Sequence, residues 1–191
     1  MNNEQSKDID TLTQIASRHK FHQYFEEQWQ RLALEQKPLS LIYCDIDSLK
    51  YYNDYFGRTA GDDCICQIAS SIRDTASSLV TTAITARCGG DEFWVILPQT
   101  DATDAIQIAE SIRSGVKALQ IHHAEINALQ IHHANFVLSK FVTVSLGVST
   151  TIPDINILPE NLIKAVDEAV GQAKNDGRDR VIFKEFTANL P

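Results

Sequence analysis

The sequence predicts a single α/β domain in which helices flank a central mixed, mostly antiparallel sheet. Three observations support this fold class. Apolar residues recur with the helical period in some segments and with the strand period in others, and the two kinds of segment follow one another along the chain. A Gly-Gly pair separates two short strand-like runs, which is typical of an antiparallel hairpin. The length of 191 residues fits one domain with a substantial core.

The first part of the chain alternates between helix and strand. Aromatic and leucine side chains at helical spacing predict a first helix that ends before Lys37-Pro38, and a strand follows over Ser40–Asp45. A helical run is expected from Ser48. A second helical face covers Ile65–Ile72, and Gly61-Asp62 is expected to cap its start.

The second part opens with the hairpin. Its strands are expected over Thr82–Arg87 and Glu92–Leu97, and Gly89 and Gly90 are expected to adopt the positive φ values of a tight primed turn. The strand near Val142–Val148 alternates apolar and small polar residues, which predicts a half-buried strand. The remaining elements are expected to be two helices and a short strand, over 105–119, 162–173 and 181–183.

Composition excludes several classes of protein. The chain carries 25 Asp and Glu against 17 Lys and Arg, a net charge of -8, which argues against a general binder of nucleic acid or of anionic membranes. The longest apolar run, Phe93–Leu97, is far shorter than the roughly 20 residues of a membrane helix. The polar N-terminus does not resemble a secretory signal, so we expect a cytoplasmic protein. Four irregularly spaced cysteines do not form a disulfide framework.

An internal duplication lies in the second half of the chain. The heptapeptide Ala118–Ala124 recurs as Ala128–Ala134, and the two copies contain four of the six histidines. One interpretation is a metal cluster, because neutral imidazoles bind zinc. The other, which we favour, is a loop or hairpin extension over residues 118–137, because adjacent histidines in an extended segment point to opposite faces.

Two acidic segments carry the candidate chemistry. Asp91 and Glu92 follow the Gly-Gly pair, and Asp45 and Asp47 stand where a predicted strand ends. Carboxylates brought together at a strand end and a hairpin tip can hold one or two Mg²⁺ ions. The helix that follows the strand would present free backbone N–H groups to phosphates carried by those ions.

The segment Gly89-Gly90-Asp91-Glu92-Phe93 resembles the motif that gives the GGDEF domain of diguanylate cyclases its name. Further segments in the order and at the separations of that family are Asp10–Thr13, Asp45–Asp54, Tyr55–Asp62, Thr143–Gly147 and Ala173–Arg178. The resemblance implies a palm-like fold of the nucleotidyl cyclase type. It places the domain over residues 10–187, after a polar tail of residues 1–9.

The resemblance also implies roles for individual residues. Metal ligands would be the side chains of Asp45, Asp91 and Glu92 and the carbonyl of Ile46, around two Mg²⁺ ions, or Mn²⁺ in their place. Asp91 and Glu92 would be the catalytic residues, with Asp91 as the proton acceptor. The substrate-binding residues would be Asn53 and Asp62 at the guanine base, and Ser48, Leu49, Lys50, Gly89, Gly90, Lys174 and Arg178 around the phosphates.

Some of these roles have simpler alternatives. Lys174 and Arg178, taken as four apart on one helical face, could clamp phosphates or merely complement the helix dipole. Arg87 is expected to brace the hairpin, and Trp94 is expected to lie in the core. We expect Asp54, Asp63 and Asp176 to be surface acids.

The implied reaction joins two GTP molecules into cyclic di-GMP and releases two pyrophosphates, across a transient homodimer because one domain offers one nucleotide site. The family's inhibitory Arg-x-x-Asp positions hold Val80 and Ala83 here, so no product inhibition is expected through them. The alternatives are an inactive GTP- or nucleotide-binding signalling module and a histidine-mediated metal-binding or scaffold protein.

Overall fold

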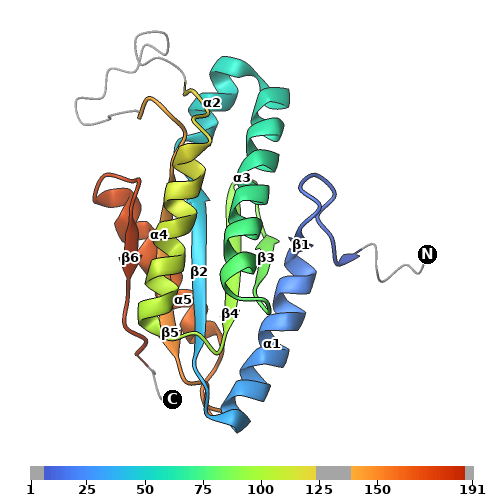
Figure 1. Ribbon diagram of the computed structural model, residues 1–191, viewed down its shortest axis with the longest axis vertical. Coiled ribbons are helices and arrows are strands. Elements are labelled where there is room, and N and C mark those ends of the chain that lie inside the picture. Colours follow the sequence, from blue (N-terminus) through green and yellow to red (C-terminus); the bar gives the residue numbers. More distant parts are fainter. Residues whose placement is uncertain (1–6, 124–138, 188–191) are drawn as a thin grey trace.

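The computed structural model describes residues 7–123 and 139–187. In these residues a six-stranded sheet lies between helices on both of its faces, and the long helices run roughly along the strands (Figure 1). The elements in chain order are β1 (Ala16–Ser17), α1 (Arg18–Glu35), β2 (Leu39–Ile46), α2 (Leu49–Phe56), α3 (Arg58–Leu79), β3 (Ile84–Arg87), β4 (Glu92–Pro98), α4 (Ala102–Ala118), β5 (Val144–Thr151), α5 (Glu160–Asn175) and β6 (Val181–Phe183).

The sheet is mixed and mostly antiparallel, as the sequence predicts. Its strand order is β1-β3-β4-β2-β5-β6. The three inner pairs, β3 with β4, β4 with β2 and β2 with β5, are antiparallel, whereas β1 and β6 run parallel to their neighbours. In this register Asp45, near the end of β2, lies opposite Glu92 on one side and Ser145 on the other.

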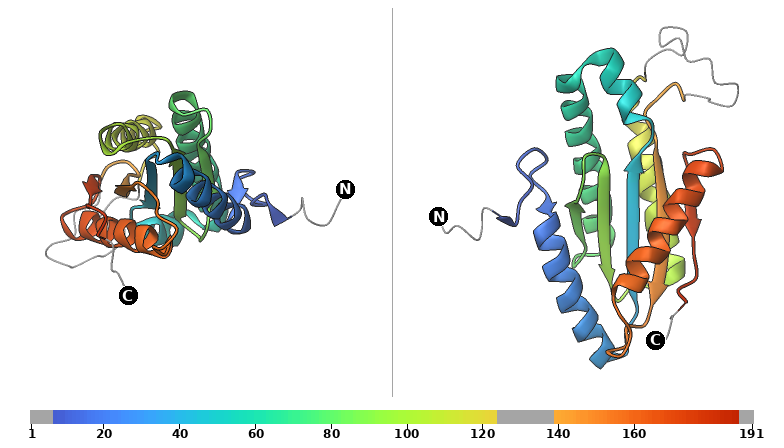
Figure 2. Two further views of the ribbon diagram at one scale, coloured as in Figure 1. Left: turned by 90° about the horizontal axis from the view of Figure 1, so that it is seen from below. Right: turned by 180° about the vertical axis from the view of Figure 1, so that it is seen from behind.

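Two apolar layers hold the sheet in place, one on each face. The face toward α3 and α4 contains Ile42 and Cys44, and the face toward α1 and α5 contains Leu41 and Tyr43. The right-hand view of Figure 2, seen from behind, shows α1 and α5 together in front of the sheet. All eight residues of β2 are buried because helices cover both faces. This central strand therefore places its last residues at a fixed point beneath the helix ends.

Two expectations about local structure are wrong. The α3 helix begins at Arg58, ahead of the Gly61-Asp62 cap that the sequence suggested, because Gly57 (φ 86°) makes the sharp break between α2 and α3. The strand β5 is not half-buried. Its first six residues, from Val144, are buried because the small polar side chains between the apolar ones lie beneath α5.

The described residues on the two sides of 124–138 lie close together. His122 and Phe141 form an isolated antiparallel bridge, and the His123 amide donates to the Lys140 carbonyl at 2.9 Å. The predicted extension over residues 118–137 lies mostly outside the described residues and stays a prediction. The predicted domain start at residue 10 also stays a prediction, although Ile9 already pairs with Ala16.

Candidate active site

The predicted metal-binding residues gather at one end of the sheet. Asp45 and Glu92 are register partners on β2 and β4, so their side chains leave the same face of the sheet. The Ile46 amide donates a hydrogen bond to the Asp91 carbonyl at 3.2 Å, which fixes the hairpin against the end of β2. Antiparallel pairing therefore brings together residues almost fifty positions apart in the sequence.

Asp45 is a buried carboxylate paired with a lysine. Its side chain is 8% exposed, and the Lys174 ammonium lies 2.7 Å from its Oδ2 atom. Burial raises the pKa of Asp45 to about 6, although Lys174 opposes the rise; the nearby charges of Asp91 and Asp47 add to it. A buried carboxylate of this kind requires a cation, and Lys174 supplies one.

The donor atoms fit a hard divalent cation in chemical type. Carboxylate and carbonyl oxygens are the ligands that Mg²⁺ prefers, and Asp45, Ile46, Asp91 and Glu92 present such oxygens at one end of the sheet. Among residues 7–123 and 139–187, however, no three His, Cys, Asp or Glu side chains are already grouped closely enough to hold an ion. An ion would therefore have to draw these side chains together.

A cleft of about 550 Å³ opens beside these acids, between α2, α3 and the hairpin. Its lining includes the apolar side chains of Leu49 and Ile65. The predicted substrate residues Lys50, Asn53, Asp62, Gly90 and Asp91 also line it, together with Asp54, Arg58 and Arg87.

Asn53 is held in this cleft by close packing against α3. A Cβ atom at Gly61 would lie 1.7 Å from its Oδ1 atom. Within the described residues Oδ1 is buried and accepts no hydrogen bond. Gly61 is thus required for the position of the Asn53 amide, not for the start of α3.

The hairpin tip is braced from two directions, as expected for Arg87. The Arg87 guanidinium donates to the Gly90 carbonyl at 2.8 and 3.2 Å and to the Asp10 carboxylate at 3.2 Å. Burial alone would raise the pKa of Asp10, but hydrogen bonds from Thr13 and Arg87 lower it below its usual value.

The conformation expected for the glycine pair is wrong. Among the described residues only Gly57 and Gly177 are glycines with positive φ, so Gly89 and Gly90 form the turn without it. Close approach explains the first glycine, because a Cβ atom at Gly89 would lie 2.3 Å from Glu92 Oε2. The turn therefore leaves space for the Glu92 carboxylate.

The predicted phosphate-binding residues come from two segments. Ser48 (φ 61°) precedes α2, with no side-chain cap on the first amides of that helix. Lys174 lies in the last turn of α5, but Arg178 lies beyond the helix, because α5 ends at Asn175 and the chain turns at Gly177 (φ 115°). The expected clamp on one helical face is therefore wrong. Ser48 and Arg178 nevertheless line one small cavity of about 40 Å³.

Two further acidic residues lie at this end of the sheet: Asp47, which the sequence places among the strand-end carboxylates, and Asp179, which it does not single out. Asp47 is 5% exposed and accepts hydrogen bonds from Thr143, Ser145 and the amide of Asp179. Asp179 forms ion pairs with Arg113 and Lys117 of α4. The sequence contains one indication of the position of Asp47. Side chains two residues apart along a strand lie on the same face, so Asp47 is expected on the face of Asp45.

The remaining expectations concern residues outside the chemistry. Trp94 is 8% exposed and stacks on Tyr43 with ring centroids 4.4 Å apart, which confirms its place in the core. The surface acids Asp54, Asp63 and Asp176 are exposed, as expected. His122 is exposed and His123 is buried, so the two neighbours do point to different environments. The histidines of the second copy, His132 and His133, lie outside the described residues.

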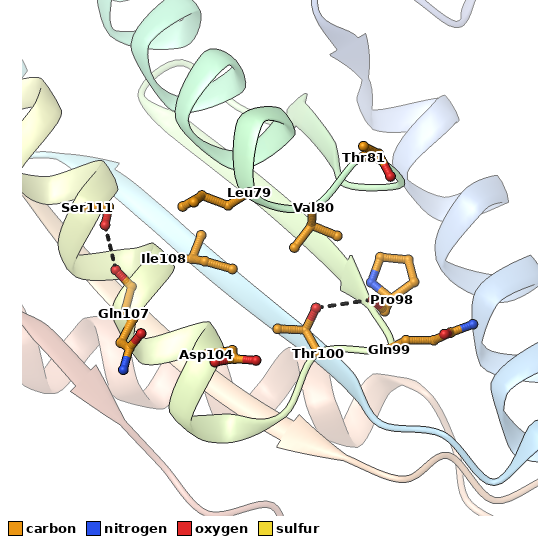
Figure 3. Close-up of a pocket in the computed structure, with 10 residues that line it drawn as sticks. All are labelled: Leu79, Val80, Thr81, Pro98, Gln99, Thr100, Asp104, Gln107, Ile108 and Ser111. Atoms are coloured by element: carbon orange, nitrogen blue, oxygen red, sulfur yellow. Dashed lines mark hydrogen bonds between the residues drawn. The ribbon is translucent and has the colours of Figure 1, made fainter.

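Another hollow, of about 590 Å³, lies at the opposite end of β4, between the end of α3 and the start of α4 (Figure 3). Val80, at the first position of the family's inhibitory motif, points into it. None of its ten lining residues, all of them described, is Lys or Arg. A dinucleotide would find no cation in this lining to balance its phosphates. The absence of product inhibition stays a prediction.

Comparison with known proteins identifies the family. Residues 7–180 match the family described as "Diguanylate cyclase, GGDEF domain", and the chain belongs to this family. Diguanylate cyclase DgcM of Escherichia coli (strain K12) is 34% identical over 174 residues, which are 91% of this chain and 37% of that protein. Response regulator PleD of Caulobacter vibrioides is 35% identical over 178 residues, 92% of this chain and 36% of that protein. The chain thus spans little more than a third of the length of these relatives.

A solved structure confirms the predicted fold class. The coiled coil and GGDEF domain of DgcB from Caulobacter crescentus, crystallised in complex with c-di-GMP, superimposes with a TM-score of 0.79 at 26% sequence identity. The match covers 94% of this chain and 87% of that one. Within the described residues, no helix has the length and apolar character needed to cross a bilayer.

Proposed function

We propose that this domain is a diguanylate cyclase, which condenses two GTP molecules into cyclic di-GMP with release of two pyrophosphates. The observation that carries the proposal is the meeting of Asp45, Asp91 and Glu92 at one end of the sheet, directly beside a cleft lined by Asn53 and Asp62. Membership of the GGDEF family supports the same activity.

The cleft supports a guanine site. Asp62 can accept hydrogen bonds from the two donors on the Watson–Crick edge of guanine, whereas adenine presents an acceptor there and would leave a buried polar clash. The Asn53 amide, whose Oδ1 atom has no partner within the described residues, adds a second polar contact. Leu49 and Ile65 provide the apolar surface on which the base would lie.

The triphosphate would extend from this cleft across the end of β2. The uncapped amides at Ser48 and Leu49, with Lys50 nearby, would donate to its oxygens. Lys174 would move its ammonium from Asp45 to a phosphate, and Arg178 would bind a second phosphate with its planar fork. Gly89 and Gly90 would let the hairpin backbone approach the substrate.

The reaction is an attack of the 3′-hydroxyl of one GTP on the α-phosphate of the other. A new phosphodiester bond forms, pyrophosphate leaves, and the second half-reaction closes the ring. Mg²⁺, or Mn²⁺ in its place, bound by Asp45, Asp91, Glu92 and the Ile46 carbonyl, would polarise the α-phosphate and lower the pKa of the attacking hydroxyl. Asp91 would accept the proton of that hydroxyl, and Glu92 would hold the second ion.

The symmetry of the product requires that two domains act together. Cyclic di-GMP is two-fold symmetric, and each domain has one nucleotide site, so two domains must face each other during the reaction. The rate per domain should therefore rise with protein concentration. An inactive nucleotide-binding module would have the same cleft and bind GTP, but it would form no product at any protein concentration.

The test is incubation of the chain with Mg²⁺ and GTP over a range of protein concentrations, followed by chromatographic identification of the products. Cyclic di-GMP whose rate of formation per domain rises with concentration supports the proposal. The variant Asp91→Asn is the matched control, because it keeps the size of the side chain and removes the proton acceptor; it should bind GTP and form no product. Unreacted GTP with a confirmed dimer would refute catalysis and leave the binding module as the function.

A further inference from the structure

The loop that follows α5 is the least regular part of the proposed phosphate site. Arg178 and Asp179 both have positive φ, 65° and 45°, and so does Ser48 (61°) at the other phosphate-binding segment. Residues with a side chain seldom adopt this conformation, and it persists where surrounding contacts impose it.

Asp47 joins the two segments. It immediately precedes Ser48, and its buried carboxylate accepts a hydrogen bond from the amide of Asp179 at 3.2 Å. The hydroxyls of Thr143, just before β5, and of Ser145 on β5 donate to the same carboxylate, each at 2.7 Å, and hold it in one orientation. One side chain thus fixes the position of the loop relative to the start of α2.

Asp179 fixes the same loop from the outer side. Its Oδ1 atom lies 2.7 Å from an Arg113 guanidinium nitrogen, and its Oδ2 atom binds the Lys117 ammonium. Both cations project from α4, whose position on the sheet is set by the buried core. The backbone of residue 179 is therefore held between Asp47, just past the end of β2, and α4, and the backbone of the neighbouring Arg178 is fixed with it.

From this chain of contacts we infer that Asp47 and Asp179 are positioning residues, which hold Arg178 and the start of α2 in the arrangement that receives the β- and γ-phosphates. The inference rests on the proposed function and adds to it two residues that touch neither metal nor substrate. Neither residue lines the guanine cleft, so their loss should weaken binding of the triphosphate and leave binding of the base unchanged.

The test is the binding of two ligands to the variant Asp179→Ala. The first ligand is 3′-deoxy-GTP with Mg²⁺, which lacks the attacking hydroxyl and is not consumed; the second is GMP, which lacks the β- and γ-phosphates. We expect the dissociation constant for 3′-deoxy-GTP to rise about tenfold, as for the loss of one charge-assisted contact, and that for GMP to stay unchanged. Asp179→Asn, which keeps a hydrogen-bond acceptor for Arg113, should recover part of the affinity.

Glu110→Gln is the matched control. Glu110 lies 2.8 Å from the same Arg113 and makes no hydrogen bond or ion pair with the loop within residues 7–123 and 139–187, so its loss should change neither affinity. Equal affinity of the parent and Asp179→Ala for 3′-deoxy-GTP would overturn the inference, and so would an equal loss of both ligands, which indicates general damage to the fold. A parent chain that binds neither ligand would instead refute the proposed function.

Discussion

The buried carboxylate of Asp45 should make the metal-free protein less stable as the pH rises. Its pKa of about 6 stands above the ordinary 3.8 of an aspartate, and at about 1.4 kcal/mol per pKa unit this difference corresponds to about 3 kcal/mol. Because the folded-state pKa is raised, the contribution of Asp45 to stability is full below the unfolded-state pKa and is lost as the pH rises through the folded-state value.

The variant Asp45→Asn removes this titration and keeps the size of the side chain. Between about pH 4 and about pH 8 the parent should lose about 2 kcal/mol of stability relative to the variant, so the free energy of unfolding of Asp45→Asn should rise by that amount against the parent's. The assay is urea denaturation of both proteins in metal-free buffer at the two pH values. The exposed acid Asp63, on the outer side of α3, gives the control variant Asp63→Asn, which should show no such difference.

Two results would refute this reasoning. The difference between Asp45→Asn and the parent could be the same at both pH values, or the variant could lose more stability at the higher pH. Either outcome would mean that the ion pair with Lys174 already offsets the burial of the charge. The variant should also form no cyclic di-GMP, because it lacks a metal ligand of the proposed site.

Three further predictions test other parts of the site. Gly89→Ala should reduce kcat about tenfold with a small change in Tm, since the new methyl group would lie 2.3 Å from Glu92 Oε2 and displace that carboxylate; an unchanged kcat would contradict the crowding. Asp62→Ala should weaken GTP binding about tenfold and reduce the preference for GTP over ATP, measured by calorimetry, because the base loses its acceptor; an unchanged preference would remove Asp62 from the guanine site. Added cyclic di-GMP should leave initial rates unchanged up to the concentrations at which it competes with GTP, since Val80 replaces the arginine of the inhibitory motif; non-competitive inhibition would show that another site takes the product.

Much of the fold was predictable from sequence because local periodicity sets it. The helical face of Ile65–Ile72, the hairpin around the glycine pair and the strand Val181–Phe183 all form where the pattern predicts them. The start of α3 was missed because a glycine can either begin a helix or allow close packing within it. Only the neighbour of Gly61, the Asn53 side chain, decides between these uses.

The candidate site was predictable where a motif is contiguous and less so where the contacts are long-range. The acids of the hairpin and of β2 lie together as expected. The hydrogen bonds of Asp47 reach Thr143, Ser145 and Asp179, which are 96, 98 and 132 residues away along the chain. No local pattern encodes such pairs. The position of Arg178 was missed for a different reason, because the turn at Gly177 follows the end of α5 at Asn175 and takes Arg178 off the helix.

The most direct test of the central claim is the phosphorus balance of the reaction. ³¹P NMR spectra of the chain with Mg²⁺ and GTP should show the triphosphate signals replaced by pyrophosphate and by the phosphodiester signal of cyclic di-GMP, with two pyrophosphates for each cyclic dinucleotide. The same sample with Asp91→Asn should keep its triphosphate. Release of orthophosphate with GDP, or pyrophosphate without a phosphodiester product, would contradict the account, because the site would then hydrolyse GTP and not join two molecules of it.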